Sequence, residues 1–465
     1  MAEARSTAEQ MPDASDRVSM RSWYALFVLI LLFLVSMIDR SIISMLIGSI
    51  KADLGLDDFQ VSLLMGAAFG ICYVLFATPF GWAADRFPRP YVLAFGLAFW
   101  SLACMSCGLA GTFLGLFVSR MAVGAGEACL SPSAYPLLSE LFPRRRVPTA
   151  LALYHLGGVM GGAMALFVGG IVVSFTMQTG GLSLPLLGEL RPWQLAFVVV
   201  GLPGLPLVLL ALTLPEPRRQ PERRIVEAPQ PGALKAYVWS HRRLLFCHHF
   251  GFALALMVAY GKGFWLPEFL VRKFGWDMVY IGSLLAAMGL TAGLISQFVA
   301  VQVIGLLSRR GHSDAVMRGY ISIMVVGTLA SVLAFSTDNV APTIAGLFLS
   351  SVVTSAGMTC GSSSLQLLTP VALRGRLSGI FVSVTSLMGL GIGPSVIGAL
   401  TEYVLGGKDQ IGNSLLIFAV TCQLGVIALL AWGLAPARKA MAEVAPAPDT
   451  PPAEADPGLR EAPAQ

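Results

Sequence analysis

Five charged side chains lie inside stretches that are otherwise apolar enough to cross a membrane as helices. They are Asp39, Arg40, Arg120, Glu127 and Lys262. An ionised side chain near the middle of a membrane helix costs about 2.5 to 3.5 kcal/mol, so it is retained where it faces a protein interior or a water-filled path. Carboxylates in such places exchange protons and cations hold anions, which predicts the ion-coupled handling of a charged molecule.

The spacing of these residues indicates where their side chains lie. Arg120 and Glu127 are seven residues apart, so they share one helix face about 10 Å from each other, and both should face the protein interior. Counted at about 1.5 Å per residue, Lys262 lies about as deep from the outer face as Asp39. For Arg120 and Lys262 the competing interpretation is that the long side chain extends to the membrane surface.

The chemistry divides between proton exchange and substrate binding. We expect Asp39 and Glu127 to couple protons, because burial favours a neutral carboxyl whereas a nearby arginine favours the charged form. Substrate binding is assigned to Arg40, Arg120, Lys262 and Tyr260. Three cations against two carboxylates leave a charge of +1 with both acids ionised and +3 with both protonated, so protonation should attract an anion.

The composition places these residues in a membrane protein. The chain has 465 residues, of which 55% are hydrophobic and 12% charged, with a mean hydropathy of +0.73. Such values lie outside the range of soluble domains, so an all-α integral membrane protein is predicted. Twelve membrane-spanning helices are expected at residues 23–48, 60–83, 91–110, 113–137, 149–176, 193–214, 243–270, 278–307, 315–335, 341–368, 376–404 and 412–434.

The order of these segments predicts two six-helix bundles. The first covers residues 23–214 and the second residues 243–434, with a linker at 215–242 that is rich in Pro, Arg and Glu. Residues 1–22 form an N-terminal tail, and residues 435–465, nearly without large apolar side chains, form a tail expected to be disordered. A Leu-Leu pair followed by two arginines and a Gly-rich span occurs in each half, which favours pseudo-symmetric bundles with a path between them.

The positive charges predict the orientation. With the N-terminus inside, the inside segments carry 23 Lys and Arg and the outside loops carry 5. The positive-inside rule therefore places both termini in the cytoplasm of a multi-pass protein, which we assign to a bacterial inner membrane.

A loop after the second span carries a recognisable motif. Residues 81–89 read Gly-Trp-Ala-Ala-Asp-Arg-Phe-Pro-Arg, which resembles the GxxxDRxxR signature of the major facilitator superfamily and implies its twelve-helix fold. Gly81, Asp85, Arg86 and Arg89 are expected to form a conformational latch between the halves on the cytoplasmic side. The alternative is an ordinary basic loop. The segment after span eight, residues 305–310, lacks the aspartate, so the latch would be asymmetric.

The fourth span resembles one branch of that superfamily. Residues 120–128 match the RxxxGxGEA pattern of spinster proteins, which also carry an Asp-Arg pair in the first span, here Asp39 and Arg40. That branch is associated with export of lysolipids and sphingosine phosphate. The resemblance implies an amphiphilic anion as substrate, whereas the charge arithmetic alone would equally allow a small organic anion.

Other classes of function are less well supported. There is no GxxxxGK[ST] motif, the seven cysteines lie in or beside apolar stretches, and no metal-ligand spacing occurs in the spans. We therefore expect no cofactor or metal, no nucleic-acid partner, and the proton gradient as energy source. The prediction is a monomeric proton-coupled secondary transporter, not an enzyme, that works by alternating access among membrane lipids; a membrane enzyme or a lipid receptor is the rival from another class.

Overall fold

The computed structural model describes residues 18–143, 146–180, 182–184, 188–217, 232–370 and 373–444. Most of the expected N-terminal tail, half of the linker and residues 445–465 lie outside the described residues. Within these ranges, twelve helices are long and apolar enough to cross a membrane, which confirms the predicted number and the all-α fold class.

The N-terminal half supplies the first six membrane-spanning helices. Its helices are α1 (Met20–Met45), α2 (Ile47–Leu54), α3 (Asp58–Met65), α4 (Ala67–Arg86), α5 (Arg89–Cys107), α6 (Phe113–Glu127), α7 (Leu130–Leu141), α8 (Val147–Thr179), α9 (Pro192–Gly201) and α10 (Gly204–Leu212). Three of the six spans are built from two consecutive helices each: α3 with α4, α6 with α7, and α9 with α10. A short antiparallel hairpin of β1 (Leu182–Leu184) and β2 (Gly188–Leu190) joins α8 to α9.

The C-terminal half supplies the other six. Its elements are α11 (Ala233–Ser240), α12 (Arg242–Phe274), α13 (Met278–Arg309), α14 (Ala315–Phe335), α15 (Val340–Ser355), α16 (Gly357–Leu368), α17 (Arg374–Ser386), η4 (Leu387–Ile392), α18 (Gly393–Ala399), η5 (Leu400–Val404), η6 (Lys408–Gln410) and α19 (Ile411–Val444). Two boundaries correct the expectation: α11 forms within the linker, and α19 continues ten residues past 434 to Val444, so residues 435–444 are helical.

Local sequence signals explain where the helices begin and end. The Ser19 hydroxyl accepts a hydrogen bond from the backbone N–H of Ser22 at 3.1 Å and caps α1. Asp57 and Gln60 exchange side-chain to backbone hydrogen bonds of 2.6 and 3.0 Å at the start of α3, which satisfies two N–H groups that the helix leaves unpaired. Helix α12 stops at Gly275, whose φ of 66° suits glycine.

The eleventh span departs from regular helix. It contains two π-helical turns, η4 and η5, on either side of α18. Such turns occur frequently at functional sites, because the wider winding redirects the backbone. At η4 the backbone of Gly391 approaches Gly70 of α4 so closely that a Cβ on Gly70 would lie 2.7 Å from the Gly391 nitrogen. The two halves therefore meet backbone to backbone at this level.

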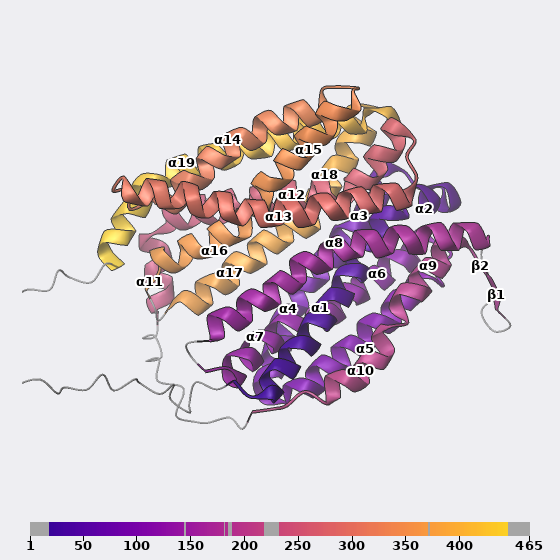
Figure 1. Ribbon diagram of the computed structural model, residues 1–465, viewed down its shortest axis with the longest axis horizontal. Helices are drawn as coiled ribbons and strands as arrows, with labels where there is room; N and C mark the ends of the chain where they lie inside the picture. Colours follow the sequence, from indigo (N-terminus) through magenta and orange to yellow (C-terminus); the bar gives the residue numbers. More distant parts are fainter. Residues whose placement is uncertain are drawn as a thin grey trace, which may run out of the picture.

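The halves join at one end of the molecule and separate at the other. We call the end where α1 begins and α19 ends the tail end, and the opposite end the far end; the ribbons of the two halves diverge toward the tail end, at the left of Figure 1. At the far end a single hydrophobic core contains residues of both halves, such as Leu64 and Ile397. At the tail end each half has its own core, around Trp100 in one and Phe252 in the other.

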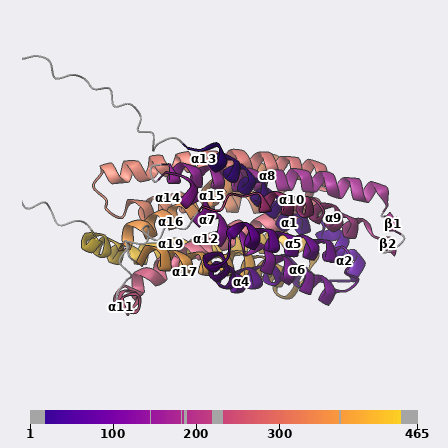
Figure 2. The same cartoon turned by 90° about the horizontal axis from the view of Figure 1, so that it is seen from below.

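Two seams hold the halves together. One joins α8 to α13 and the other joins α3 and α4 to α18 and η4; the second view places α8 with α13 along one edge and α4 along the opposite one (Figure 2). In the first seam a Cβ on Gly282 would lie 2.5 Å from the Leu166 carbonyl oxygen. Small residues thus allow the close approach that membrane helices use for packing.

Candidate functional site

Two acids and two arginines of the N-terminal half form a buried charged cluster, which we call the quartet. It consists of Asp39 and Arg40 on α1 and Arg120 and Glu127 on α6. Asp39 and Arg120 are 0% exposed, Glu127 1% and Arg40 8%. The structure therefore brings together the four charges that the sequence placed in the first and fourth spans, and Arg120 does not extend to the membrane surface.

Glu127 and Arg40 form the ion pair of the quartet. Glu127 Oε1 accepts hydrogen bonds from Arg40 Nη2 and, at 2.6 Å, from the hydroxyl of Ser36 one turn earlier on α1. Its second oxygen, Oε2, is buried and has no hydrogen-bond partner among the described residues. A proton on Glu127 would weaken the pair with Arg40, so the protonation of this carboxyl and the freedom of the guanidinium are linked.

Asp39 is held by different donors. Trp100 Nε1 donates to Asp39 Oδ2 at 3.0 Å, and Cys104 Sγ lies 3.8 Å from Oδ1. Arg120 donates from Nη1 to the Asp39 backbone oxygen at 3.3 Å and from Nε to the Leu64 oxygen at 3.4 Å. The Asp39 carboxylate thus lies near the buried cation of Arg120, which is bonded to the backbone of Asp39 and not to its side chain. Asp39 can therefore gain or lose a proton without breaking an ion pair.

The Arg40 guanidinium lies over two aromatic rings. Its Cζ is 4.8 Å from the centroid of Phe69 and 5.4 Å from that of Tyr73, both on α4. Tyr260 of α12, half-buried, approaches from the other half closely enough to interact with the charge of Arg40. These rings stabilise the cation without occupying its N–H groups, of which Nη2 is bonded to Glu127. Of the substrate residues expected in the second half, Tyr260 lies within electrostatic range of Arg40.

Lys262 does not join the quartet. It is 2% exposed and its Nζ donates a hydrogen bond of 2.8 Å to Ser350 Oγ on α15, inside the C-terminal bundle. It is therefore not at the membrane surface either. The structure separates Lys262 from Arg40 because α12 presents residue 262 toward α15, whereas Tyr260 lies on another face of the same helix. The expected charge balance is corrected accordingly: the quartet is neutral with both acids ionised and +2 with both protonated.

Among the described residues, the polar contacts of Arg86 and Arg89 in the loop motif lie within the N-terminal half. Asp85 and Arg86 are exposed, and Arg86 Cζ lies 4.3 Å from the ring centroid of Trp82 in the same helix. Arg89 is buried and donates two hydrogen bonds to Glu140, at 2.7 and 2.9 Å, within its own half. Gly81, in the same loop-end segment, faces Pro132 of α7, again within that half. The latch between the halves stays a prediction for a state in which the tail end is closed.

A second buried charged cluster closes the far end, and the sequence did not reveal it. Asp58 of α3, whose side chain is fully buried, pairs with Lys51 of α2 and accepts from Arg272 of the other half, Nη1 to Oδ2 at 2.9 Å and Nη2 to Oδ1 at 2.8 Å. Arg272 also donates to Glu268 one turn earlier, at 2.7 Å, and the Asp58 backbone N–H donates to Glu402 at 3.2 Å. These contacts link the halves by charge as well as by packing.

Two acids at the far end are less exposed than their position predicts. Glu268 and Glu402 lie near outer helix ends, where we expect solvated side chains, yet Glu268 is 5% exposed and Glu402 is half-buried. The spacing of Glu268 and Arg272, four residues apart on one helix, was the available signal. No sequence signal marked Asp58 as their partner, because that contact depends on how the two halves pack.

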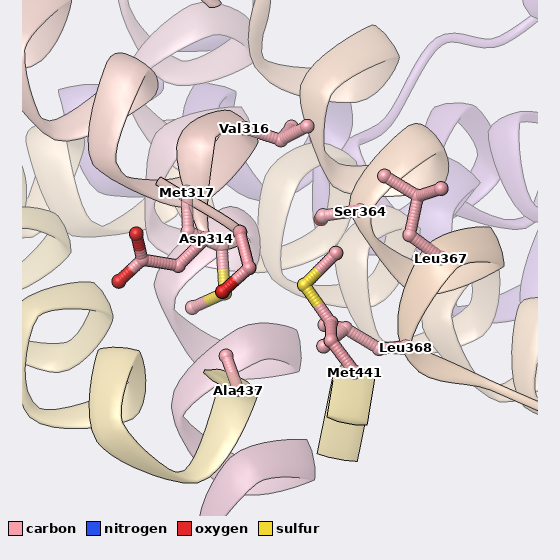
Figure 3. A pocket seen from close by; sticks show the side chains of 9 residues that line it. Asp314, Val316, Met317, Ser364, Leu367, Leu368, Ala437 and Met441 are labelled. Carbon is pink, nitrogen blue, oxygen red and sulfur yellow. The ribbon is translucent and has the colours of Figure 1, made fainter. Parts of the chain in front are cut away.

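Two cavities lie away from the quartet. One of about 440 Å³ opens beside the far-end cluster and is lined by Lys51, Glu268 and Arg272 among others. The second lies between α14, α16 and α19 at the tail end; Figure 3 shows Met317, Leu368 and Met441 around it. Its volume of about 10 Å³ holds roughly one water molecule, too little for a substrate.

Comparisons with known proteins agree with this architecture. The profile of the Major Facilitator Superfamily matches residues 29–388. The chain is 27% identical over 432 residues to an MFS-type efflux pump of Mycolicibacterium smegmatis, covering 90% of this chain and 93% of the relative. It is 26% identical over 333 residues to the probable galactarate/D-glucarate transporter GudP of Bacillus subtilis, covering 64% of this chain and 68% of the relative.

Spinster proteins are also among the relatives. Protein spinster of Drosophila melanogaster is 26% identical over 267 residues, which cover 56% of this chain and 41% of that protein. The fold matches the crystal structure of a bacterial homolog to the human lysosomal transporter spinster, in an inward-facing and unoccupied conformation, with a TM-score of 0.74, 21% identity and coverage of 92% of this chain and 99% of the other. With its two six-helix halves, its buried quartet and a family match over most of its length, the chain belongs to the major facilitator superfamily as a spinster-like transporter, not an enzyme.

Proposed function

We propose that this protein is a proton-coupled secondary transporter that moves an anion, preferably an amphiphilic one, by alternating access. The observation that carries the proposal is the bond between Arg40 and Glu127 inside the quartet. Protonation of Glu127 releases Arg40, and protonation of both acids changes the quartet from neutral to +2. An anion then binds to the Arg40 guanidinium, because the neutral carboxyl of Glu127 no longer competes for it.

The aromatic surroundings support the role of Arg40 in binding. Phe69 and Tyr73 hold the guanidinium plane, and Tyr260 reaches it from the second half. An anion bound to Arg40 would therefore contact both halves, which is the requirement for a ligand that biases alternating access. Arg120 supplies a second cation behind Arg40, and its Nη2 has no hydrogen-bond partner among the described residues.

The substrate class is proposed from chemistry and from likeness. The spinster resemblance favours a lysophospholipid or a sphingosine-phosphate-like lipid, whose phosphate suits a guanidinium. A small organic anion is the second candidate, because a glucarate transporter and a hexuronate transporter of Bacillus subtilis are among the relatives. Both classes carry the negative charge that Arg40 would bind.

The orientation and the coupling complete the proposal. With the tail end in the cytoplasm of a bacterial inner membrane, the far-end cluster closes the outer side and the structure corresponds to an inward-open state. The monomer is the working unit in this scheme, since every residue of the site belongs to one chain. The proton gradient drives the cycle and no cofactor takes part.

Uptake into proteoliposomes tests the proposal. We expect an imposed pH gradient to drive flux of a lysophospholipid series in which affinity rises by about 0.8 kcal/mol per CH₂ of the tail. For glucarate and other small acids, affinity should change little with chain length. Arg40→Ala should abolish uptake, whereas Arg309→Ala, which removes an exposed arginine of α13, should leave it unchanged. Chemical alteration of the lipid without flux, or full uptake by Arg40→Ala, would contradict the proposal.

A further inference from the structure

Lys262 is a buried amine that the anion site does not use. Its Nζ is the start of a hydrogen-bonded chain that crosses the C-terminal bundle. Ser350 Oγ of α15 lies 2.8 Å from Nζ, Ser331 Oγ of α14 lies 3.2 Å from Ser350, and Gln423 Nε2 of α19 lies 3.1 Å from Ser331. All four side chains are buried, between 0% and 2% exposed.

No acid balances this amine within the described part of the chain. Lys262 forms no ion pair there, and its bonded neighbours Ser350, Ser331 and Gln423 are neutral. Charged or titratable side chains lie elsewhere on α12, such as Tyr260, His249 and Glu268, and on helices packed against it, such as Cys422 on α19 and Asp39 and Arg40 on α1. Among the described residues, no hydrogen bond or ion pair joins any of them to Nζ. A charged amine so far from water and from any carboxylate is costly, whereas the neutral amine is not.

The hydrogen-bonded chain suits either form of the amine. An ammonium donates only, so the bonds would run from Nζ through Ser350 and Ser331 to the amide oxygen of Gln423. A neutral amine also accepts, so the bonds would run in reverse, from Gln423 Nε2 through the two hydroxyls to the lone pair on Nζ. In this structure Nζ donates to Ser350 and Gln423 Nε2 donates to Ser331, while the bond between the two hydroxyls can run either way and Gln423 Oε1 is buried without a partner among the described residues.

We propose that Lys262 is a proton-binding site of the C-terminal half, with Ser350, Ser331 and Gln423 as the positioning residues that satisfy both of its forms. The ligand is a proton, which binds to the nitrogen lone pair and leaves it again without any covalent step. This inference deepens the proton coupling proposed above and gives each half a proton site: the quartet in the first and Lys262 in the second.

Proton counting on the purified full-length protein tests the inference without any substrate. Wild type and Lys262→Met are titrated from pH 6 to pH 9, and the protons released are counted. We expect Lys262→Met to release one proton fewer over this range. Equal counts would overturn the inference, because the amine would then keep a single protonation state between pH 6 and pH 9.

A matched variant and a direct measurement keep the test decisive. Lys235→Met removes an exposed amine on α11 and should release as many protons as wild type; a loss equal to that of Lys262→Met would overturn the assignment. The chain has six lysines, so their ¹⁵Nζ signals can be followed in native protein even if Lys262→Met fails to fold. One signal, absent in Lys262→Arg, should shift between pH 6 and pH 9, and six unchanged signals would refute the proposal.

The outcomes separate this inference from the proposed function. Proton release by Lys262 does not depend on flux, so a positive titration with no proton-driven uptake would leave the inference standing and remove the transport proposal. Proton-driven uptake together with equal proton counts in wild type and Lys262→Met would leave the transport proposal standing and remove the inference about Lys262.

Discussion

Replacing Asp58 with asparagine should open the far end of the transporter. Asp58 is the residue through which Arg272 of the second half is bonded to the first, with two hydrogen bonds of 2.8 and 2.9 Å, and it also pairs with Lys51. Asparagine keeps the size of the side chain and removes its charge. While the far end is closed, Lys51 and Arg272 then lack the carboxylate that they share. In a state with an open far end, water solvates both cations instead.

The magnitude follows from the burial of the pair. Removing one member of a buried ion pair costs about 3 to 5 kcal/mol, because the remaining charge is left uncompensated. Arg272 keeps its bond to Glu268 and its side chain is 14% exposed, so we expect less, about 2 to 3 kcal/mol. At about 1.4 kcal/mol per factor of ten, this destabilises the closed far end roughly 30- to 150-fold relative to the open state.

Distances between spin labels report the change. Residues 52 and 409 are exposed at the far end, one on each half, and labels on them should move apart in Asp58→Asn. Asp53→Asn is the matched control, since Asp53 bonds to Arg191 and to Trp193 Nε1 within one half only. A distance distribution in Asp58→Asn like that of wild type, or the same shift in Asp53→Asn, would refute the role of the far-end cluster.

Three further predictions concern the quartet, the loop motif and a seam. In wild type, label distances across the tail end should depend on pH, and Asp39→Asn and Glu127→Gln should lose much of that dependence; an unchanged midpoint in both would refute the proton assignment. Asp85→Asn should raise the population that is open at the tail end by roughly fivefold, as expected for loss of a surface latch of about 1 kcal/mol, and distributions identical to wild type would count against it. Gly282→Leu should separate α13 from α8 and favour far-end opening, because its Cβ would lie 2.5 Å from the Leu166 oxygen, whereas Gly289→Leu on the same helix meets nothing within 4 Å and should have no such effect.

The sequence predicted the spans and the quartet because both depend on local composition. Long apolar runs specify membrane helices without reference to neighbours, and charges inside them must turn inward wherever the bundle forms. Residues 120 and 127 share a helix face, so their common burial was predictable from spacing alone. The pairing was not: Arg40 bonds to Glu127 rather than to its neighbour Asp39, because the rotation of α1 against α6 decides which side chains meet.

Lys262 and Asp58 show that the position of a residue along a span predicts its contacts less well than the helix face on which its side chain lies. The sequence placed Lys262 with the anion site from its depth along the span, yet a rotation of a helix by two residues, about 200°, separates the face of Tyr260 from the face of Lys262. Asp58 lies in the first turn of α3, and its buried carboxylate pairs with Arg272 of the second half. Periodicity predicts which side chains of a helix face the interior. The rotation and packing of whole helices decide which of those side chains meet, and the contacts of Asp58 depend in addition on how the two halves pack against each other.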